Sequence, residues 1–410
     1  MKLKFLIVGL LLMFAFAACS SSEEADDPGY TAGEDAGYVE DGGEDAVAGE
    51  TATGEPIRIG IIAPLTGGAA LFGQAASDGS ILAFEQANAA GGILGGRPIE
   101  FIRLDDEGAI PVSIAAYERL VYSDEVVAIV GPVTSGPSNA VAGIAEGHRT
   151  PMISPTATAA DVTLGRDFMF RACFLDATQA QAVAYFARNN YGAQTAAILF
   201  NNSMDYSRGL AENFEIFFER MGGTITNSLA YATGDTDFRA QLTTIAAGNP
   251  DILFLPEYFT NVSLKSRQAR EAGITATLFG ADGWEGVLEL LGEDASIMDG
   301  SFFSAHFATD DPNPIVQNFV STYTERFDIS PSSFAALGFD AARIIINAIE
   351  QAGSTDNDAI INAMQNITYD GVTGSITFDS NGNPIKPIVM ISIDNASASL
   401  YHRFDVGYFD

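Results

Sequence analysis

The chain has 410 residues and a formal net charge of −33, from 53 acidic and 20 basic side chains. Residues 56–410 alone carry a net charge of −23, so the acidity is not confined to the N-terminal part. Phosphate binding needs a positive surface, and this charge therefore excludes nucleic acid as an expected partner. Cys19 and Cys173 are the two cysteines, and because Cys19 lies at the edge of an N-terminal signal, no intramolecular disulfide is expected.

The first residues predict a secretory signal. Lys2 and Lys4 precede an apolar run at 5–18 that ends in small residues before Cys19. A charged start, an apolar middle and a small-residue cleavage site form this pattern, and the run is shorter than the ~20 residues of a membrane span. Cleavage before a cysteine resembles the lipobox of bacterial lipoproteins, although Phe16 stands where that pattern prefers Leu. We predict a signal peptide at 1–18 and a lipidated Cys19, with an ordinary cleaved signal as the alternative.

The segment at 19–55 predicts a tether between the lipid and the folded body. Its residues 20–55 hold twelve Asp and Glu, no Lys or Arg, and few large aliphatic side chains. Such a segment cannot bury enough apolar surface to offset its ordering entropy, and its like charges repel one another. We expect an acidic, disordered tether. A specific acidic interaction tail is the alternative.

The body alternates short apolar runs with amphipathic stretches, which predicts strands alternating with helices. The expected strands are 57–62, 99–104, 126–130, 152–153, 195–200, 225–231, 252–255 and 277–279. The expected helices are 74–90, 112–121, 139–146, 178–189, 207–221, 238–246 and 263–272. Helical stretches at 315–327 and 334–352 then precede strand-like runs at 374–378 and 388–393, and residues 401–410 receive no assignment.

This alternation predicts an α/β fold in which helices cover both faces of parallel sheets, with right-handed crossovers. The body exceeds what one hydrophobic core usually serves, and the pattern pauses near 168–175. We therefore predict two doubly wound parallel-sheet lobes, at 56–174 and 175–305. After residue 305 the chain is expected to return to both lobes, and residues 306–390 are expected to complete them.

The segment at 131–146 is the first candidate site, because Thr134, Ser135 and Ser138 follow a strand-like run where a helix starts. Ligands of open α/β sheets lie at the carboxyl ends of strands, and the free amides of a helix start bind anions. These groups suit a small anion such as a carboxylate. The same side chains could simply cap the helix, and both interpretations stay open here.

Signals for catalysis are weak. His148, His306 and His402 are far apart in sequence, without metal-ligand or base–nucleophile spacing, and we interpret each as an ordinary side chain. No nucleophile elbow and no phosphate-binding loop occurs. The glycine run at 91–96 follows a helical stretch and indicates a helix stop. We expect no enzyme activity, no cofactor and no metal, and a buried Cys173.

Several segments, taken in order, resemble one family. They are IGIIAPLTG at 59–67, NAAGGILGGRP at 88–98, the pair at 105–106, VGP at 130–132, PMISP at 151–155 and RQAREAG at 267–273. This set is similar to the leucine/isoleucine/valine-binding family, the type I solute-binding proteins of bacterial ABC importers. The resemblance implies two lobes joined by a three-crossing hinge that close on a small ligand. It also implies an extracytoplasmic protein, expected to be a monomer, that passes its ligand to permease subunits.

The resemblance implies roles for residues of the first lobe. Ser135 and Thr158, with the backbone at Thr156, match positions that hold the ligand carboxylate. Phe72 matches an aromatic residue that covers the ligand side chain.

In the second lobe, Tyr206 matches a pocket tyrosine, while Tyr258 and Asp282 match positions that receive the ligand ammonium. Asp282 follows an apolar run at a strand end, a suitable place for such an acceptor, although an Asp before Gly283 could also merely form a turn. Trp284 could cover the pocket, but packing within the lobe is favoured.

Two departures from the family leave the ligand side chain open. Ala109 and Thr134 stand where one subgroup carries a disulfide, and Asp282 is shorter than the Glu of some branched-chain binders. We expect an amino acid, with an amide or urea-type solute as the alternative. A sensor lobe for a signalling partner and an anchored hydrolase are the other classes of function.

Overall fold

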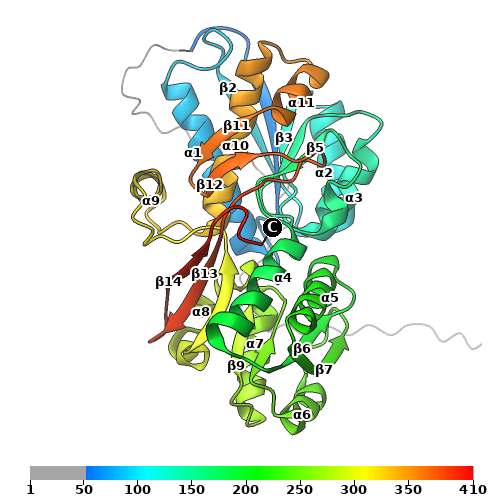
Figure 1. Ribbon diagram of the computed structural model, residues 1–410. Coiled ribbons are helices and arrows are strands. Elements are labelled where there is room, and N and C mark those ends of the chain that lie inside the picture. The colour runs from blue at the N-terminus through cyan, green and yellow to red at the C-terminus, as the bar shows by residue number, and fades with distance from the viewer. Residues whose placement is uncertain (1–51, 410) are drawn as a thin grey trace, which may run out of the picture. The chain divides into compact units, whose positions relative to one another are not determined.

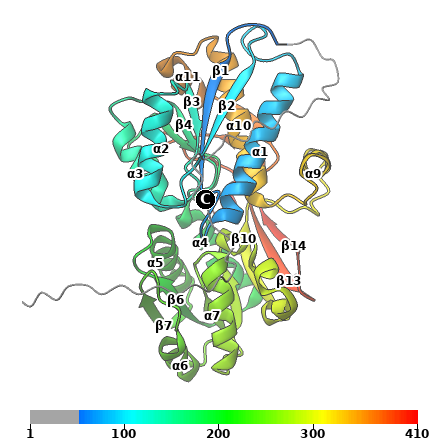
Figure 2. The ribbon, with the colours of Figure 1, turned by 180° about the vertical axis from the view of Figure 1, so that it is seen from behind.

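The structure is a computed structural model that describes residues 52–409. The predicted signal peptide, the lipidated Cys19 and the predicted tether up to residue 51 lie outside the described residues. Across the described part, no helix is both long enough and apolar enough to cross a membrane. Figures 1 and 2 show two sheets, each with helices packed against it.

The first sheet is entirely parallel, with the strand order β2-β1-β3-β4-β5. Strands β3 and β4 are buried along their whole length, as expected when helices cover both faces of a parallel sheet. The chain moves from β1 to β2 on one side and then to β3 on the other, so the strand order reverses between β1 and β3. The strands are β1 Ile57–Ala63, β2 Ile99–Asp105, β3 Ala128–Val130, β4 Met152–Ser154 and β5 Met169–Arg171.

The helices of this lobe include one from far along the chain. Helix α10 packs along α1, and a Cβ on Gly338 would lie 1.9 Å from the carbonyl oxygen of Ala76, so a glycine is needed for this close approach. The contact brings Phe72 of α1 onto Phe334 of α10, with parallel rings 4.0 Å apart. The elements around the first sheet are α1 Ala70–Ala89, α2 Ile110–Tyr122, α3 Ser135–Ala145, α10 Ser333–Ala352, α11 Asn357–Gln365, β11 Thr368–Gly371 and β12 Gly374–Thr377.

The second sheet is mixed, with the order β14-β13-β10-β9-β8-β6-β7. Strands β6 to β10 are parallel, whereas β13 and β14 add an antiparallel pair at one edge. Here the order reverses between β6 and β8. The strands are β6 Thr195–Asn201, β7 Thr224–Tyr231, β8 Ile252–Phe254, β9 Thr277–Gly280, β10 Ser301–Ala305, β13 Ile388–Asp394 and β14 Ser397–Phe404. The helices are α4 Asp176–Tyr185, α5 Asp205–Arg220, α6 Arg239–Gly248, α7 Phe259–Glu271 and α8 Val287–Leu291.

The chain crosses between the two lobes three times, which confirms the predicted architecture. The crossings run at 172–175 after β5, at 306–313 between β10 and α9 (Pro314–Phe327), and at 378–387 between β12 and β13. Lys386 Nζ donates to the carbonyl of Ala172 at 3.1 Å and so joins the third crossing to the first. The ring of His306 lies 3.6 Å from that of Phe174 and joins the second crossing to the first. We propose that the lobe boundaries lie at these crossings.

Several local predictions need correction, and the helices predicted from residues 74 and 263 begin four residues earlier, at Ala70 and Phe259. Helix α3 begins at Ser135, four residues before the predicted start, because the Ser, Gly and Pro that weaken a helix interior are tolerated in its first turn. Helix α11 was not predicted, although its N-cap Asp356 accepts from the amide of Ala359 at 3.0 Å. Residues 397–404 form β14, which depends on pairing with β13 rather than on a local pattern.

Candidate ligand-binding site

A small cavity of about 10 Å³ is lined by residues that both lobes supply. Apart from Phe334, which lies in α10, these residues follow the carboxyl ends of strands near the points where the strand order reverses. Open α/β sheets place their ligands there. Lobe 1 contributes Phe72, Val133, Thr134, Thr156 and Phe334, and lobe 2 contributes Tyr206, Tyr258, Asp282 and Gly283. A larger cavity of about 260 Å³ beside Glu285 contains none of the predicted ligand residues.

Five of the seven predicted ligand residues line this cavity, namely Phe72, Thr156, Tyr206, Tyr258 and Asp282. The other two, Ser135 and Thr158, are buried just outside the lining. The hydroxyl of Ser135 accepts from the amide of Ala159 at 3.3 Å. The hydroxyl of Thr156 donates to the carbonyl of Val133 at 2.6 Å, which leaves the predicted ligand contact to its backbone.

The hydroxyls at the start of α3 do not cap that helix. Thr134 occupies the N-cap position but its side chain makes no capping hydrogen bond. Ser138 donates to the carbonyl of Pro132 at 2.8 Å and thus holds the loop before the helix. The capping interpretation is therefore wrong for these side chains, and the first turn of α3 keeps amides that can receive an anion.

Asp282 provides the negative charge of the site. It is buried, and both of its carboxylate oxygens accept hydrogen bonds: Oδ1 from the Tyr206 hydroxyl at 2.7 Å, and Oδ2 from His306 Nε2 at 3.1 Å. The Tyr206 hydroxyl in turn accepts from the amide of Gly283 at 2.9 Å. Both donors to Asp282 are uncharged, since burial lowers the pKa of His306 to about 4. No Lys or Arg of the described chain lies within 4.0 Å of this carboxylate.

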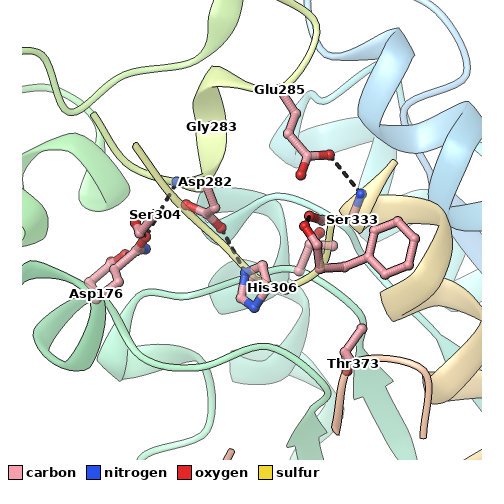
Figure 3. A network of polar contacts seen from close by, with 12 residues as sticks. Asp176, Asp282, Gly283, Glu285, Ser304, His306, Ser333 and Thr373 are labelled. Atoms are coloured by element: carbon pink, nitrogen blue, oxygen red, sulfur yellow. Dashed lines mark hydrogen bonds and ion pairs between the residues drawn. The ribbon is translucent and has the colours of Figure 1, made fainter. Parts of the chain in front are cut away.

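A second buried carboxyl group, Asp176, lies at the start of α4 (Figure 3). Its Oδ1 accepts from Gln179 Nε2 at 3.1 Å. The hydroxyl of Thr158 lies beside it, but neither that hydroxyl nor Oδ2 of Asp176 forms a hydrogen bond of good geometry. Burial, reinforced by the charge of Asp282, raises the pKa of Asp176 to about 8. Asp176 is therefore protonated at neutral pH.

Aromatic rings form the apolar wall. Phe72 meets Tyr258 edge to face, with ring centres 5.3 Å apart, and Tyr206 lies 4.9 Å from Tyr258. Gly283 leaves room between these rings, because a Cβ there would lie 2.8 Å from both the Tyr206 hydroxyl and the carbonyl of Glu257.

Trp284 packs within lobe 2, as predicted. Its side chain is fully buried, and its indole N–H donates to the carbonyl of Leu255 at 2.9 Å. Cys173 is buried, also as predicted.

Three residues of this region were missed from the sequence: Asp176, His306 and Phe334. The sequence indicated for His306 only an ordinary surface or satisfied histidine, and in the structure it is buried and hydrogen bonded to Asp282. The position of His306 in the sequence could have marked it as a site residue, because it follows strand β10 directly, just as Asp282 follows β9 within two residues. Phe334 had no local signal, since only the packing of α10 on α1 brings it to Phe72.

The sequence is similar to a known family of proteins. The family model described as "Periplasmic binding protein" matches residues 56–398. The Leu/Ile/Val-binding protein BraC3 of Rhizobium johnstonii is 30% identical over 338 residues, which cover 79% of this chain and 90% of that protein.

Two solved structures are similar over most of their length. The leucine-binding protein LivK of Thermotoga maritima has a TM-score of 0.80 and 33% identity, covering 85% of this chain and 99% of that one. The branched-chain amino acid transporter substrate-binding protein LivJ of Streptococcus pneumoniae, solved with isoleucine, has a TM-score of 0.79 and 29% identity, with coverage of 85% and 99%.

Proposed function

Because the chain belongs to the periplasmic binding protein family, we propose that it binds a zwitterionic amino acid between its two lobes and delivers it to the permease of an ABC importer. The observation that carries this proposal is the division of charge across the cavity. Lobe 1 contributes no acidic or basic side chain to the lining, whereas lobe 2 contributes the acidic Asp282.

An α-amino acid matches this division. Its carboxylate suits the Ser135 and Thr158 hydroxyls, the backbone at Thr156 and the first amides of α3. Its ammonium suits Asp282 and the part of the cavity that Tyr258 lines. The rings of Phe72 and Phe334 provide an apolar surface for an aliphatic side chain. The relatives described above are named as binding proteins for leucine, isoleucine, valine or branched-chain amino acids. We therefore propose an aliphatic amino acid, and we expect binding without turnover.

The cavity also indicates how the ligand enters. A cavity of about 10 Å³ holds roughly one water molecule. An amino acid is much larger, so the two lobes must separate to admit it. The three crossings are the segments about which such a movement would occur.

We propose further that Cys19 anchors the protein to a membrane outside the cytoplasm. The support is the pattern of a signal that ends in small residues before this cysteine. Cys19→Ser should release the protein from the membrane fraction or block its processing. Unchanged membrane association and lipid labelling of this variant would contradict the anchor.

Calorimetry on the purified Cys19→Ser protein tests the ligand proposal. The titrants are L-leucine, L-isoleucine, L-valine and L-alanine, together with urea, acetamide and 4-methylpentanoate, which is leucine without its amino group. At least one L-amino acid should bind, and at 100-fold over its Kd it should stabilise the fold by about 2.7 kcal/mol. Binding of only the amide, the urea or the deaminated acid would overturn the proposal.

A further inference from the structure

His306 is a buried histidine in contact with Asp282, and the function proposed above gives it no role. It is the first residue after β10, and its side chain has no solvent exposure. Its Nε2 lies 3.1 Å from Oδ2 of Asp282 (Figure 3), whereas the Tyr206 hydroxyl donates to the other oxygen, Oδ1.

The protonation of this imidazole follows from its surroundings. Burial has the largest effect and lowers the pKa of His306 to about 4, although the hydrogen bond to Asp282 acts in the opposite direction. Lys386, on the third crossing, is the other charged group that influences it, and it lowers the pKa further. A neutral imidazole carries one N–H. Because Nδ1 has no hydrogen-bond partner, that hydrogen belongs on Nε2, where it is donated to Asp282.

The ring is held at the hinge between the lobes. It stacks on Phe174 of the first crossing with ring centres 3.6 Å apart and planes 23° from parallel. Packing alone does not account for a histidine here, because its buried Nδ1 is left without a hydrogen bond, a cost that a phenylalanine would avoid.

We propose that His306 is a positioning residue for ligand binding. Its Nε2–H, together with the Tyr206 hydroxyl, holds the Asp282 carboxylate in the orientation that receives the cationic group of the ligand. Its stack on Phe174 ties that orientation to the crossings about which the lobes move. Both donors are uncharged, so they orient Asp282 without cancelling its charge. A Lys or Arg at this position would instead pair with Asp282 and compete with the ligand. This inference rests on the proposed function.

Two variants distinguish the effect of the Nε2–H donor of His306 from the effect of its aromatic ring. His306→Phe keeps a ring that can stack on Phe174 but removes the donor, whereas His306→Gln removes the ring but keeps an N–H donor. His402→Phe is the matched control, because it makes the same substitution on β14, outside the cavity lining. If His306→Phe does not fold, His306→Leu is the second donor-free variant. Melting temperatures establish that each variant is folded.

The readout is the affinity for L-leucine and for 4-methylpentanoate, measured by calorimetry and, for weak binding, by competition. Where the wild-type protein prefers another amino acid, that amino acid and its deaminated acid replace this pair. His306→Phe should weaken binding of the amino acid by about tenfold to a hundredfold, as expected for one hydrogen bond to a charged group. Binding of the deaminated acid should change little, because it has no ammonium to meet Asp282. His306→Gln should recover most of the lost affinity, and His402→Phe should bind as the wild type does.

The outcomes against the proposal are distinct. Unchanged amino-acid affinity in folded His306→Phe overturns it, and so does an equal loss for both ligands, which would indicate a packing role only. Equal losses in His306→Phe and His306→Gln also overturn it. If the wild-type protein binds no amino acid at all, the proposed function fails first and this inference fails with it.

Discussion

The two sides of the cavity differ in chemistry although both are built at the carboxyl ends of parallel strands. Lobe 1 offers hydroxyls and the first amides of α3, all of them neutral. Lobe 2 offers the carboxyl group of Asp282, held by two uncharged donors, and the buried, protonated Asp176. Under the proposed function, each lobe alone would hold one end of a zwitterion. Neither lobe would then be a complete site, and binding would be coupled to closure of the lobes.

The coupling has a physical basis in desolvation. Closing the lobes removes water from around Asp282, which makes its interaction with a cation stronger and its isolation more costly. The neutral donors of lobe 1 lose less when they are left unpaired. A change on the acidic side should therefore affect binding more than an equivalent change on the neutral side.

The largest effect on ligand affinity is expected from replacing the acidic side chain that lobe 2 contributes to the cavity. Asp282→Asn should weaken amino-acid binding by roughly thirty-fold to several thousand-fold, because truncating one partner of a buried charge pair costs about 2–5 kcal/mol. Calorimetry with the amino acid that the wild type prefers is the measurement, and the melting temperature is the control. Normal binding by folded Asp282→Asn would show that the ligand places no ammonium there.

The matching change in lobe 1 is Ser135→Ala. It removes one hydrogen bond to a charged group, which costs about 1.5–3 kcal/mol, so affinity should fall by less than in Asp282→Asn. The same titration measures it. A loss at Ser135 that equals or exceeds the loss at Asp282 would reverse the comparison between the lobes.

Gly283→Ala tests how much room the lobe 2 wall of the cavity has beside Tyr206. The added methyl group would lie 2.8 Å from the Tyr206 hydroxyl, the group that donates to Asp282. Such overpacking costs typically about 1–3 kcal/mol, and we expect part of it to appear as weaker binding and part as a lower melting temperature. Gly143→Ala is a suitable control, since Gly143 is exposed beyond the first turn of α3 and a Cβ there meets no atom within 4 Å. Wild-type behaviour of Gly283→Ala would mean that Tyr206 and the backbone at Glu257 can shift to admit the methyl group without cost.

A separate effect, which involves no ligand, is expected on the pH dependence of the unfolding free energy. The pKa of Asp176 is raised from 3.8 to about 8, so between these values the folded protein holds a proton that the unfolded chain has released. This contribution to stability is complete below about pH 4 and is lost as the pH rises through about 8. Asp176→Asn is neutral throughout and should show a shallower fall in unfolding free energy between pH 5 and 8, measured by denaturant titration without ligand.

A second group provides the control for that measurement. Burial also raises the pKa of Glu285, to about 8, and its slope has the same sign. Asp176→Asn should therefore leave a residual slope, which Glu285→Gln added to it should reduce further. Identical slopes in the wild type and Asp176→Asn would show that Asp176 does not hold its proton in this range.

Much of the site could be predicted because its residues lie next to strands. Tyr206, Tyr258 and Asp282 follow β6, β8 and β9 within a few residues, and apolar runs that mark buried strands are visible in a single sequence. The alternation of such runs with amphipathic helices also determined the α/β class and the existence of two lobes. The resemblance to a known family then supplied the roles expected of these residues, which the pattern alone did not contain.

The tertiary structure decided what depends on contacts between distant segments. Phe334 joins the site only because Gly338 lets α10 approach α1 closely, and β14 exists only through its pairing with β13. The neutral His306 and the protonated Asp176 are results of burial, which depends on everything packed around them. Periodicity and turn chemistry are local properties that a sequence displays directly. Desolvation and contact across the fold are not local, and so the polar network around Asp282 could be seen only in three dimensions.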